Sequence, residues 1–359
     1  MEIYTIEQGT NRRTSIIENF ESFIWTERYD SYGDFQLVSE YNSSNSSKLT
    51  VNSYIGFDMS DRIMIVKKVT KEQSEDGSIK LKVEGKSFES IFMDRVASVN
   101  LSSANWTLSG AAGEIIRLMV QNTCVAGAPT ANDLIFGLET HNLAAGVPTS
   151  FQVKRGSNLY DKMREIAIAY GLGFRVTYDV QYQPPPVSGS VIYNAPLVFD
   201  VYQGVDLTTG YNSVKFSDDN DTLFNSTSIS SEDGYKNVAY VYSNTHTYVL
   251  NENLPSLYPG FSHKPIFVDA TDITTTAGDY VSLLSARGRQ ALSEYNKSLL
   301  VDGQVNPDGI YTYKQDYNLG DLVLIKSITG DQQTSMVTEY IWTYDSDGLN
   351  GYPTLTAIL

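Results

Sequence analysis

Residues that commonly perform catalysis or bind metals are few and scattered in this sequence. The three histidines, His141, His246 and His263, have no histidine four residues away and no adjacent Glu or Cys cluster. They therefore match neither a zinc-protease helix nor a zinc finger. The single cysteine, Cys124, follows an apolar stretch and does not open a helix, where a thiolate would be favoured. We expect Cys124 to be a buried apolar side chain, and we expect no metal ion and no cofactor.

Two acidic clusters are the best remaining candidates for a site. The cluster at residues 218–221, counted from Asp219, lacks the glycine at position six and the glutamate at position twelve of a calcium loop. The cluster at residues 345–348 lies between alternating apolar segments, which is typical of a hairpin turn. Carboxylate pairs for glycoside hydrolysis depend on separation in space, so the sequence neither favours nor excludes one. Nucleophile-elbow, Walker and dinucleotide motifs are absent, and we expect no enzyme.

Composition limits the class of protein further. The 359 residues exceed one ordinary core, so two or three domains are expected, and 25 Tyr with 14 Phe favour β-structure. The chain has 26 Lys and Arg against 42 Asp and Glu, a formal net charge of −16. The excess of acidic residues argues against specific nucleic-acid binding, because phosphate contacts require basic side chains. Ordinary solubility would explain the same excess equally well. We find neither a signal-peptide pattern nor an apolar run of about 20 residues, so no membrane insertion is expected.

The elements of the first 100 residues follow from their alternation. Phe23 and Trp25 share one face of a predicted strand, Phe35 and Leu37 alternate in the same way, and residues 32–34 supply a turn between them. Residues 63–66 and 79–84 predict a second, half-buried hairpin. Ser87 is expected to cap a short helix that closes a β-barrel over residues 1–100.

The rest of the chain alternates between helical and β patterns. Residues 101–190 predict an α+β insertion, with helices capped by Ser109 and Ser157 and a Pro-rich end at 183–190. A second β-barrel is expected from residues 191–250 and 299–359, interrupted by a helical insertion at 251–298. Within that insertion, Asp279 is expected to cap a helix over residues 279–296.

Several of these motifs, in the same order, resemble those of the siphophage tail-hub family. These are tail-tip or tail-associated-lysin-type proteins, related in architecture to the baseplate hub of contractile phages. The first signature surrounds Trp25 and Gly33, and the second runs from Gly85 to Arg95. The positions that carry the resemblance are Trp25, Gly33, Asp34, Gly85, Arg95, Gly204, Asp206, Asn237, Gly320 and Asp321.

The resemblance implies a mainly β fold with two tube-protein-like β-barrel domains plus small α/β insertion domains. It also implies a homotrimer at the distal end of a phage tail, assembled in the bacterial cytoplasm. Three copies of two similar barrels would adapt a six-fold tail tube to a three-fold tip. Expected partners are the distal tail or tail tube protein, the tape-measure protein, and tip, fibre or receptor-binding proteins. The acidic side chains are expected to line a channel through which DNA passes without specific binding.

Some relatives carry a peptidoglycan-cleaving extension. This sequence stops at Leu359, after the expected second barrel, so we expect no lytic activity. The competing hypothesis is a tail protein that binds cell-surface saccharides. Tyr311, Tyr313 and Trp342 could form an aromatic platform for sugars, but the same alternation is typical of strand packing and subunit contacts.

Overall fold

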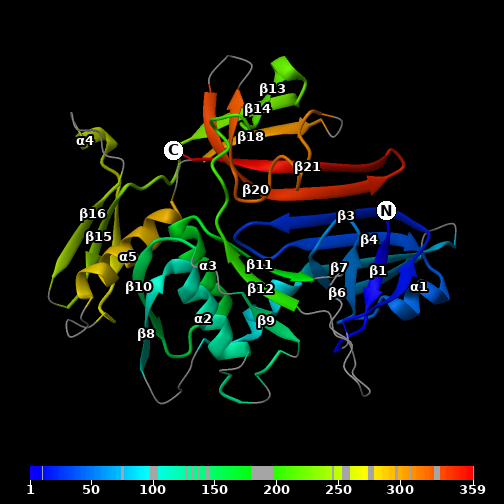
Figure 1. The fold of residues 1–359 in the computed structure, drawn as a ribbon, viewed down its shortest axis with the longest axis horizontal. Coiled ribbons are helices and arrows are strands. Elements are labelled where there is room, and N and C mark those ends of the chain that lie inside the picture. Colours follow the sequence, from blue (N-terminus) through cyan, green and yellow to red (C-terminus); the bar gives the residue numbers. More distant parts are fainter. Residues whose placement is uncertain are drawn as a thin grey trace.

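The computed structural model describes most of the chain, and Figure 1 shows its ribbon. The described residues are 1–9, 11–73, 77–97, 104–125, 128–130, 133–135, 137–141, 145–178, 197–244, 246–252, 259–273, 279–295, 298–306, 309–326 and 332–358. The expected Pro-rich end at 183–190 lies outside them.

The first part of the chain forms an antiparallel sheet in the order β3-β4-β7-β6-β5-β1-β2. Its strands are β1 (Ile3–Ile6), β2 (Arg13–Ile17), β3 (Phe20–Arg28), β4 (Asp34–Glu40), β5 (Tyr54–Phe57), β6 (Ile63–Gln73) and β7 (Ile79–Ser87). The register places Trp25 opposite Phe35 and Phe23 opposite Leu37. All four side chains are buried, which confirms the predicted hairpin.

Two short helices in this part begin beside small polar side chains. Ser87 occupies the expected N-cap position of a short helix, the 3₁₀ helix η1 (Phe88–Asp94), but its hydroxyl makes no capping bond and accepts a hydrogen bond from the Gly33 amide at 2.8 Å. Before β5, a short helix, α1 (Ser43–Lys48), begins after Asn42, whose side chain accepts from the Asn45 amide. In both cases a small polar side chain bonds to the backbone donor that the fold brings near.

The last part of the chain extends the same sheet. Its elements are β13 (Lys215–Ser217), the 3₁₀ helix η2 (Asp218–Asn220), β14 (Leu223–Ser231), β18 (Ser298–Val305), β19 (Leu322–Lys326), β20 (Gln332–Asp345) and β21 (Gly348–Ala357). One edge of β20 pairs first with β19 and then with β3, where Trp342 lies opposite Trp25. The two halves therefore share one 13-stranded sheet.

The mainly β class is confirmed, but the expected barrels are not closed. Among the described residues, no strand pairing joins β2 back to β3 or β14 back to β13. In the first half the physical reason is that the outer edge of β3, which could close that half on β2, is used by β20. The predicted hairpin between residues 340 and 348 is confirmed by the β20–β21 pairing.

The first insertion packs two helices against short sheets. It contains β8 (Asn105–Ala111), α2 (Ala112–Cys124), β9 (Leu138–Thr140), β10 (Pro148–Lys154), α3 (Leu159–Tyr170), β11 (Gly173–Tyr178) and β12 (Leu197–Tyr202). Both predicted caps are wrong: Ser109 lies within β8, and Asn158, not Ser157, caps α3 by accepting from the Asp161 amide. Cys124 is buried as expected, and burial raises the pKa of its thiol to about 11.

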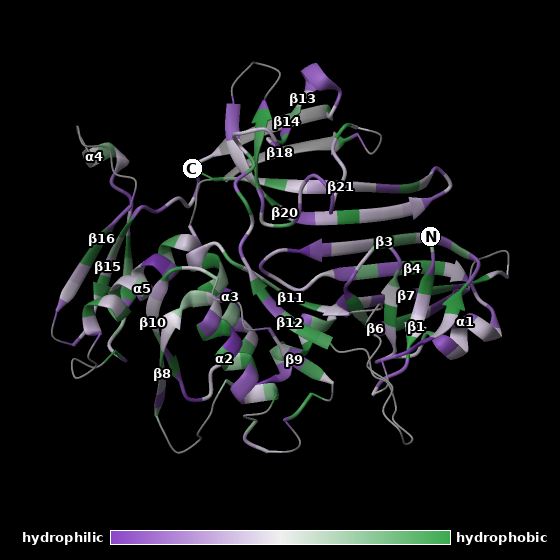
Figure 2. Cartoon of the chain, viewed as in Figure 1, coloured by the Kyte–Doolittle hydropathy of each residue, from purple (hydrophilic) through white to green (hydrophobic). Residues whose placement is uncertain are grey.

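The second insertion is a three-stranded sheet covered on one face by a helix. Its elements are β15 (Val238–Tyr242), β16 (Thr247–Asn251), α4 (Pro259–Ser262), β17 (Pro265–Asp269) and α5 (Tyr280–Ser293). The predicted helix at 279–296 is thus present, but Asp279 makes no capping bond and accepts a hydrogen bond from Ser150. The buried side chains gather into four clusters, and Figure 2 shows the apolar stripes on the strands and helices that face them. The domain boundaries themselves stay predictions.

Candidate functional site

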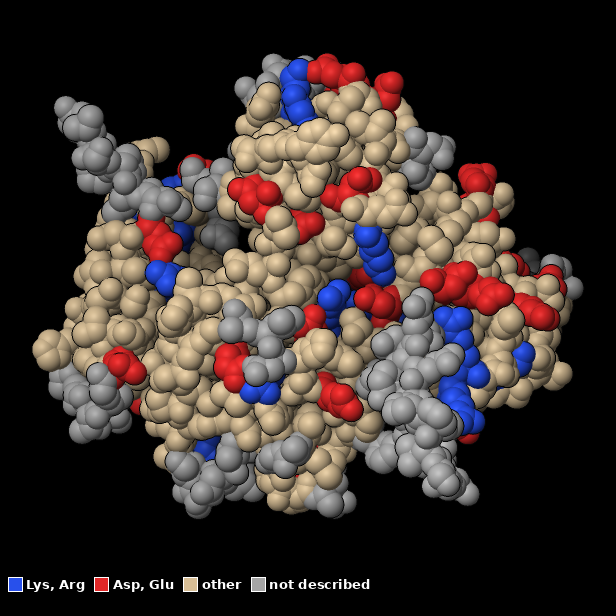
Figure 3. Space-filling view, in the orientation of Figure 1, with Lys and Arg blue, Asp and Glu red and all other residues tan. Residues whose placement is uncertain are grey.

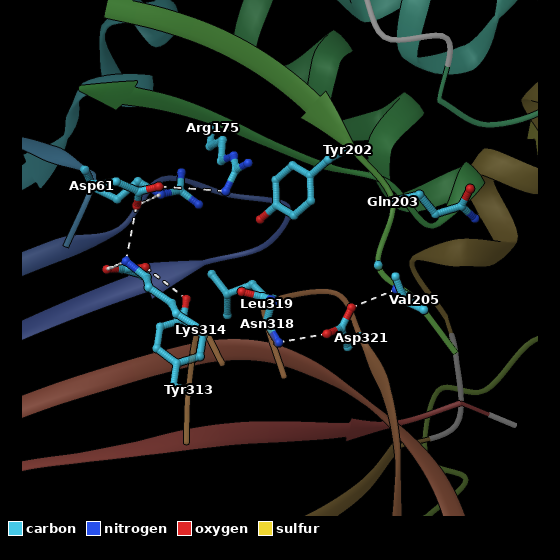
Figure 4. A pocket seen from close by; sticks show the side chains of 13 residues that line it. Asp61, Arg175, Tyr202, Gln203, Val205, Tyr313, Lys314, Asn318, Leu319 and Asp321 are labelled. Atoms are coloured by element: carbon cyan, nitrogen blue, oxygen red, sulfur yellow. Dashed lines mark hydrogen bonds and ion pairs between the residues drawn. The ribbon is translucent and has the colours of Figure 1, made fainter. Parts of the chain in front are cut away.

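A polar cavity lies where the two halves of the large sheet meet the first insertion (Figure 4). Its volume is about 380 Å³. Side chains reach it from β3, from the turn before β6, from β11 and β12, and from the segment that precedes β19. We call this region the junction, because it joins three parts of the chain that are far apart in sequence.

At the junction, two backbone segments approach each other so closely that the glycines on them have no room for a side chain. A β-carbon added at Gly204 would lie 1.9 Å from the carbonyl oxygen of Gly320. Gly320 has a φ of +89°, and a β-carbon there would lie 2.2 Å from the Tyr29 ring. Asp321 fixes the approach, because its carboxylate accepts from the amides of Val205 and Asn318, each at 2.7 Å. Three of the ten family-signature positions therefore meet here.

Tyr29 connects β3 to the first insertion. Its hydroxyl donates to the carbonyl of Gly171 at 3.0 Å and accepts from the amide of Gly204 at 3.2 Å. Burial raises the pKa of this hydroxyl above its usual range. The phenol therefore stays protonated and acts as a fixed hydrogen-bonding group.

A buried ion pair lies beside the cavity. The Arg62 guanidinium donates to the Glu89 carboxylate at 2.7 Å, and the same oxygen accepts from the Val176 amide at 2.7 Å. Both side chains are almost fully buried, with Arg62 5% and Glu89 1% exposed. Burial opposes the charge on Arg62, but the Glu89 carboxylate holds its pKa above the ordinary value. This pair ties the turn before β6 to η1 and β11.

Lys314 links the last part of the chain to the first (Figure 4). Its ammonium lies 3.3 Å from an Asp61 oxygen, 3.6 Å from a Glu27 oxygen and 3.2 Å from the carbonyl of Met59. Its φ of 67° is uncommon for a residue with a side chain. Next to it, the Tyr313 hydroxyl donates to Glu27 at 3.0 Å.

The protonation states of the ionisable side chains at the junction suit ion pairs that join parts of the chain better than they suit catalysis. Burial alone would raise the pKa of Asp61, but Lys314, Arg62 and Arg175 lower the pKa to about 2. An ionised, ion-paired carboxylate is a poor general acid. Desolvation by burial also raises the pKa of Tyr202 to about 12. Among the described residues, no three His, Cys, Asp or Glu side chains gather in a way that could hold a metal ion.

Asp61→Asn tests this electrostatic assignment. Because the pKa is lowered in the folded state, the contribution of Asp61 to stability is complete above about pH 4 and is lost as the pH falls toward 2. The shift from 3.8 to about 2 would correspond to about 2.5 kcal/mol, but the side chain is 40% exposed, so we expect about 1 kcal/mol. Urea unfolding of both proteins should show this difference at pH 7 and almost none at pH 2. An equal difference at both pH values would contradict the assignment.

The remaining signature positions lie outside the junction. Trp25 is fully buried and donates to the Ser60 hydroxyl at 3.2 Å, while Asp34 pairs with Arg28 at 2.5 Å. At Gly33 and Gly85 an added β-carbon would lie within 2.1 Å of a backbone oxygen. The other three have local roles: Arg95 follows η1, Asp206 binds Thr208, and Asn237 is buried and bonds to Ser262 and Lys264.

The sequence interpretation missed the charged residues of the junction. One signal was available, since Glu27 continues the inward alternation of Phe23 and Trp25 and is therefore expected to point into the core. A charge at such a position requires a partner. For Arg62 and Glu89 no local pattern distinguishes them from surface charges, because their partners are 27 or more residues away.

The proposed aromatic platform is largely used by internal packing. Tyr313 is 9% exposed and stacks on Tyr340 with ring centroids 3.9 Å apart. Trp342 packs edge-on against Tyr340 and Phe57, and the Tyr311 hydroxyl accepts from the Lys215 amide. Rings that cover one another leave little free face for a sugar.

The family follows from comparison with known proteins. A model described as "Siphovirus ReqiPepy6 Gp37-like protein" matches residues 1–355. The chain therefore belongs to this siphovirus family, which confirms the resemblance to siphophage tail proteins. Comparison with curated proteins gives no match.

Solved structures with a similar fold include several tail proteins. The 43 kDa tail protein of prophage MuSo2 from Shewanella oneidensis aligns over 100% of this chain and 98% of its own, with a TM-score of 0.60 and 12% identity. The tail protein from Neisseria meningitidis MC58 aligns over 99% of this chain and 96% of its own, with a TM-score of 0.55 and 14% identity. Prophage tail protein gp18 from Listeria monocytogenes EGD-e aligns over 99% of this chain and 94% of its own, with a TM-score of 0.53 and 13% identity. At these identities the likeness shows the fold. No helix among the described residues is long and apolar enough to span a membrane.

Proposed function

We propose that this protein is a structural hub at the distal end of a siphophage tail, without catalytic activity. The observation that supports this best is the pairing of β20 with β3, which makes one sheet from two separate parts of the chain. Three copies of such a two-part wall would present six similar units to the six-fold tail tube. The same three copies would present three-fold symmetry to the tip. The junction suits this role, because it fixes the angle between the two parts with buried bonds.

The continuous sheet also offers a candidate wall for a channel. On β7, Leu81 and Val83 are buried, whereas Lys80, Lys82 and Glu84 alternate with them on the opposite face. Figure 3 shows basic and acidic side chains close together on the face of the first half that is turned toward the viewer. The acidic lining expected from net charge therefore does not extend to this face, and we propose a mixed-charge lining.

Ion pairs explain how such a lining could let DNA pass. Lys80 pairs with Glu21 at 2.7 Å, and Glu84 lies 3.1 Å from both Lys82 and Lys68. Paired lysines compete poorly for phosphates, so the wall would not hold a DNA backbone strongly. In this proposal the distal tail or tube protein lies above the hub, the tape-measure protein enters the channel, and tip or receptor-binding proteins lie below.

The native mass of the purified protein tests the proposal. A homotrimer predicts about three times 39.9 kDa by light scattering across a range of concentrations. A dimer would count directly against a three-fold hub, since a closed pair of identical copies has an isologous interface and only two-fold symmetry. If the purified protein is a monomer, a pull-down with the tube-end protein tests whether it assembles only on its tail partner. Failure to bind that protein would reject the hub proposal.

A further inference from the structure

The sheet of the second insertion is covered on only one face. α5 and the loop before it pack against β15, β16 and β17, and bury Ala239, Val241 and Val268. Most residues of the same strands that point the other way are exposed, although Val238 at one end is buried and the Tyr240 ring lies 6.2 Å from that of His263. The side chains on this open face are Tyr240, Tyr242, Thr247, Val249, Asn251, Pro265, Phe267 and Asp269.

The strand register gathers aromatic and apolar side chains at the centre of the open face. Tyr240 on the middle strand lies opposite Val249 on one side and Phe267 on the other. Tyr242 stacks on Phe267 with ring centroids 6.0 Å apart. Phe267 is 66% and Val249 46% exposed. A contiguous exposed patch of this kind marks an interaction site.

We propose that the open face binds a second copy of this chain in the assembled hub, an inference that rests on the proposed function. The charge distribution fits a copy of the same chain as the occupant. Each copy carries a formal net charge of −16, so copies repel one another except where their contact surfaces are uncharged. The open face has one charged side chain, Asp269, and is rich in aromatic residues, as interface cores are.

The attachment of the insertion supports this assignment. α5 lies between the sheet and the first insertion, where the Ser150 hydroxyl donates to Asp279 at 3.0 Å and Arg289 lies over the Tyr170 ring. The face is therefore held in a fixed orientation, which lowers the entropic cost of binding. Figure 1 places this sheet at one end of the long axis, opposite the first half. A ring of identical copies joins two different faces, so the face would meet another region of the next copy.

Thiol footprinting tests whether the face becomes covered. Cys124 is fully buried with a pKa of about 11, so it gives little background. We expect alkylation of Thr247→Cys, on the open face, to slow at least tenfold in the assembled form relative to the monomer. Tyr211→Cys, at a fully exposed turn of the second half, should react at the same rate in both. Equal rates for Thr247→Cys would overturn the inference.

A charge placed in the face provides the second measurement. Phe267→Asp should shift the native mass to that of the monomer at concentrations where the parent chain is assembled, with an unchanged circular dichroism spectrum. Tyr211→Asp is the matched control and should stay assembled. If Phe267→Asp assembles normally, this face is not the contact, while the hub proposal stands. If the parent chain never assembles alone, the self-contact is rejected, and binding to the tube-end protein decides the hub separately.

Discussion

Gly204→Ala is expected to destabilise the protein by about 3 kcal/mol, because overpacking against a rigid backbone is costly. The new methyl carbon would lie 1.9 Å from the Gly320 oxygen and 2.5 Å from the Asp321 nitrogen. Neither atom belongs to a flexible side chain, so the two segments must separate. Their separation breaks the hydrogen bonds that the Val205 amide donates to Asp321 and that the Gly204 amide donates to Tyr29. Urea unfolding monitored by fluorescence gives the change in free energy.

Gly260→Ala is the matched control for this change. Gly260 lies in α4, its φ is not in the left-handed region, and an added β-carbon would meet nothing within 4 Å. We expect the control to be neutral or stabilised by up to about 1 kcal/mol, since alanine is the better helix former. Similar stability for the two variants would mean that the junction is not tightly packed.

Arg62→Met is expected to cost about 3–5 kcal/mol, the range observed when one member of a buried ion pair is removed. The change leaves the Glu89 carboxylate buried with the Val176 amide as its remaining hydrogen-bond donor. Methionine fills much of the volume of the arginine stem, so lost packing contributes little. Thermal or urea unfolding at pH 7 measures the loss.

The double variant Arg62→Met with Glu89→Gln separates charge from packing. The glutamine carbonyl can still accept from Val176, and no uncompensated charge remains, so we expect at least half of the lost stability to return. The change Lys82→Met, on an exposed ion pair with Glu84, should cost less than about 1 kcal/mol. If the double variant is as unstable as the sum of the single changes, the pair is not coupled as described.

Local patterns identified most elements but not their ends. The alternation of apolar and polar residues predicted the β3–β4 hairpin and the β20–β21 hairpin, because a strand with one buried face has a side-chain period of two. Helix ends were less predictable, since Asn158 and Ser157 are both acceptable caps by residue type. The backbone entering α3 selects Asn158, and that geometry depends on the contact between Ser157 and Ala97.

By itself the sequence determined the mainly β class, the approximate positions of the main hairpins and of the longer helices, the burial of Cys124 and the resemblance to siphophage tail proteins. These properties depend on neighbouring residues or on short motifs. Tertiary structure decided that β20 pairs with β3 in place of closing a barrel, and that Arg62 reaches Glu89. It also decided that Gly204 lies against Gly320. Such contacts join residues far apart in the chain, and their energies depend on burial and distance, which no local pattern specifies.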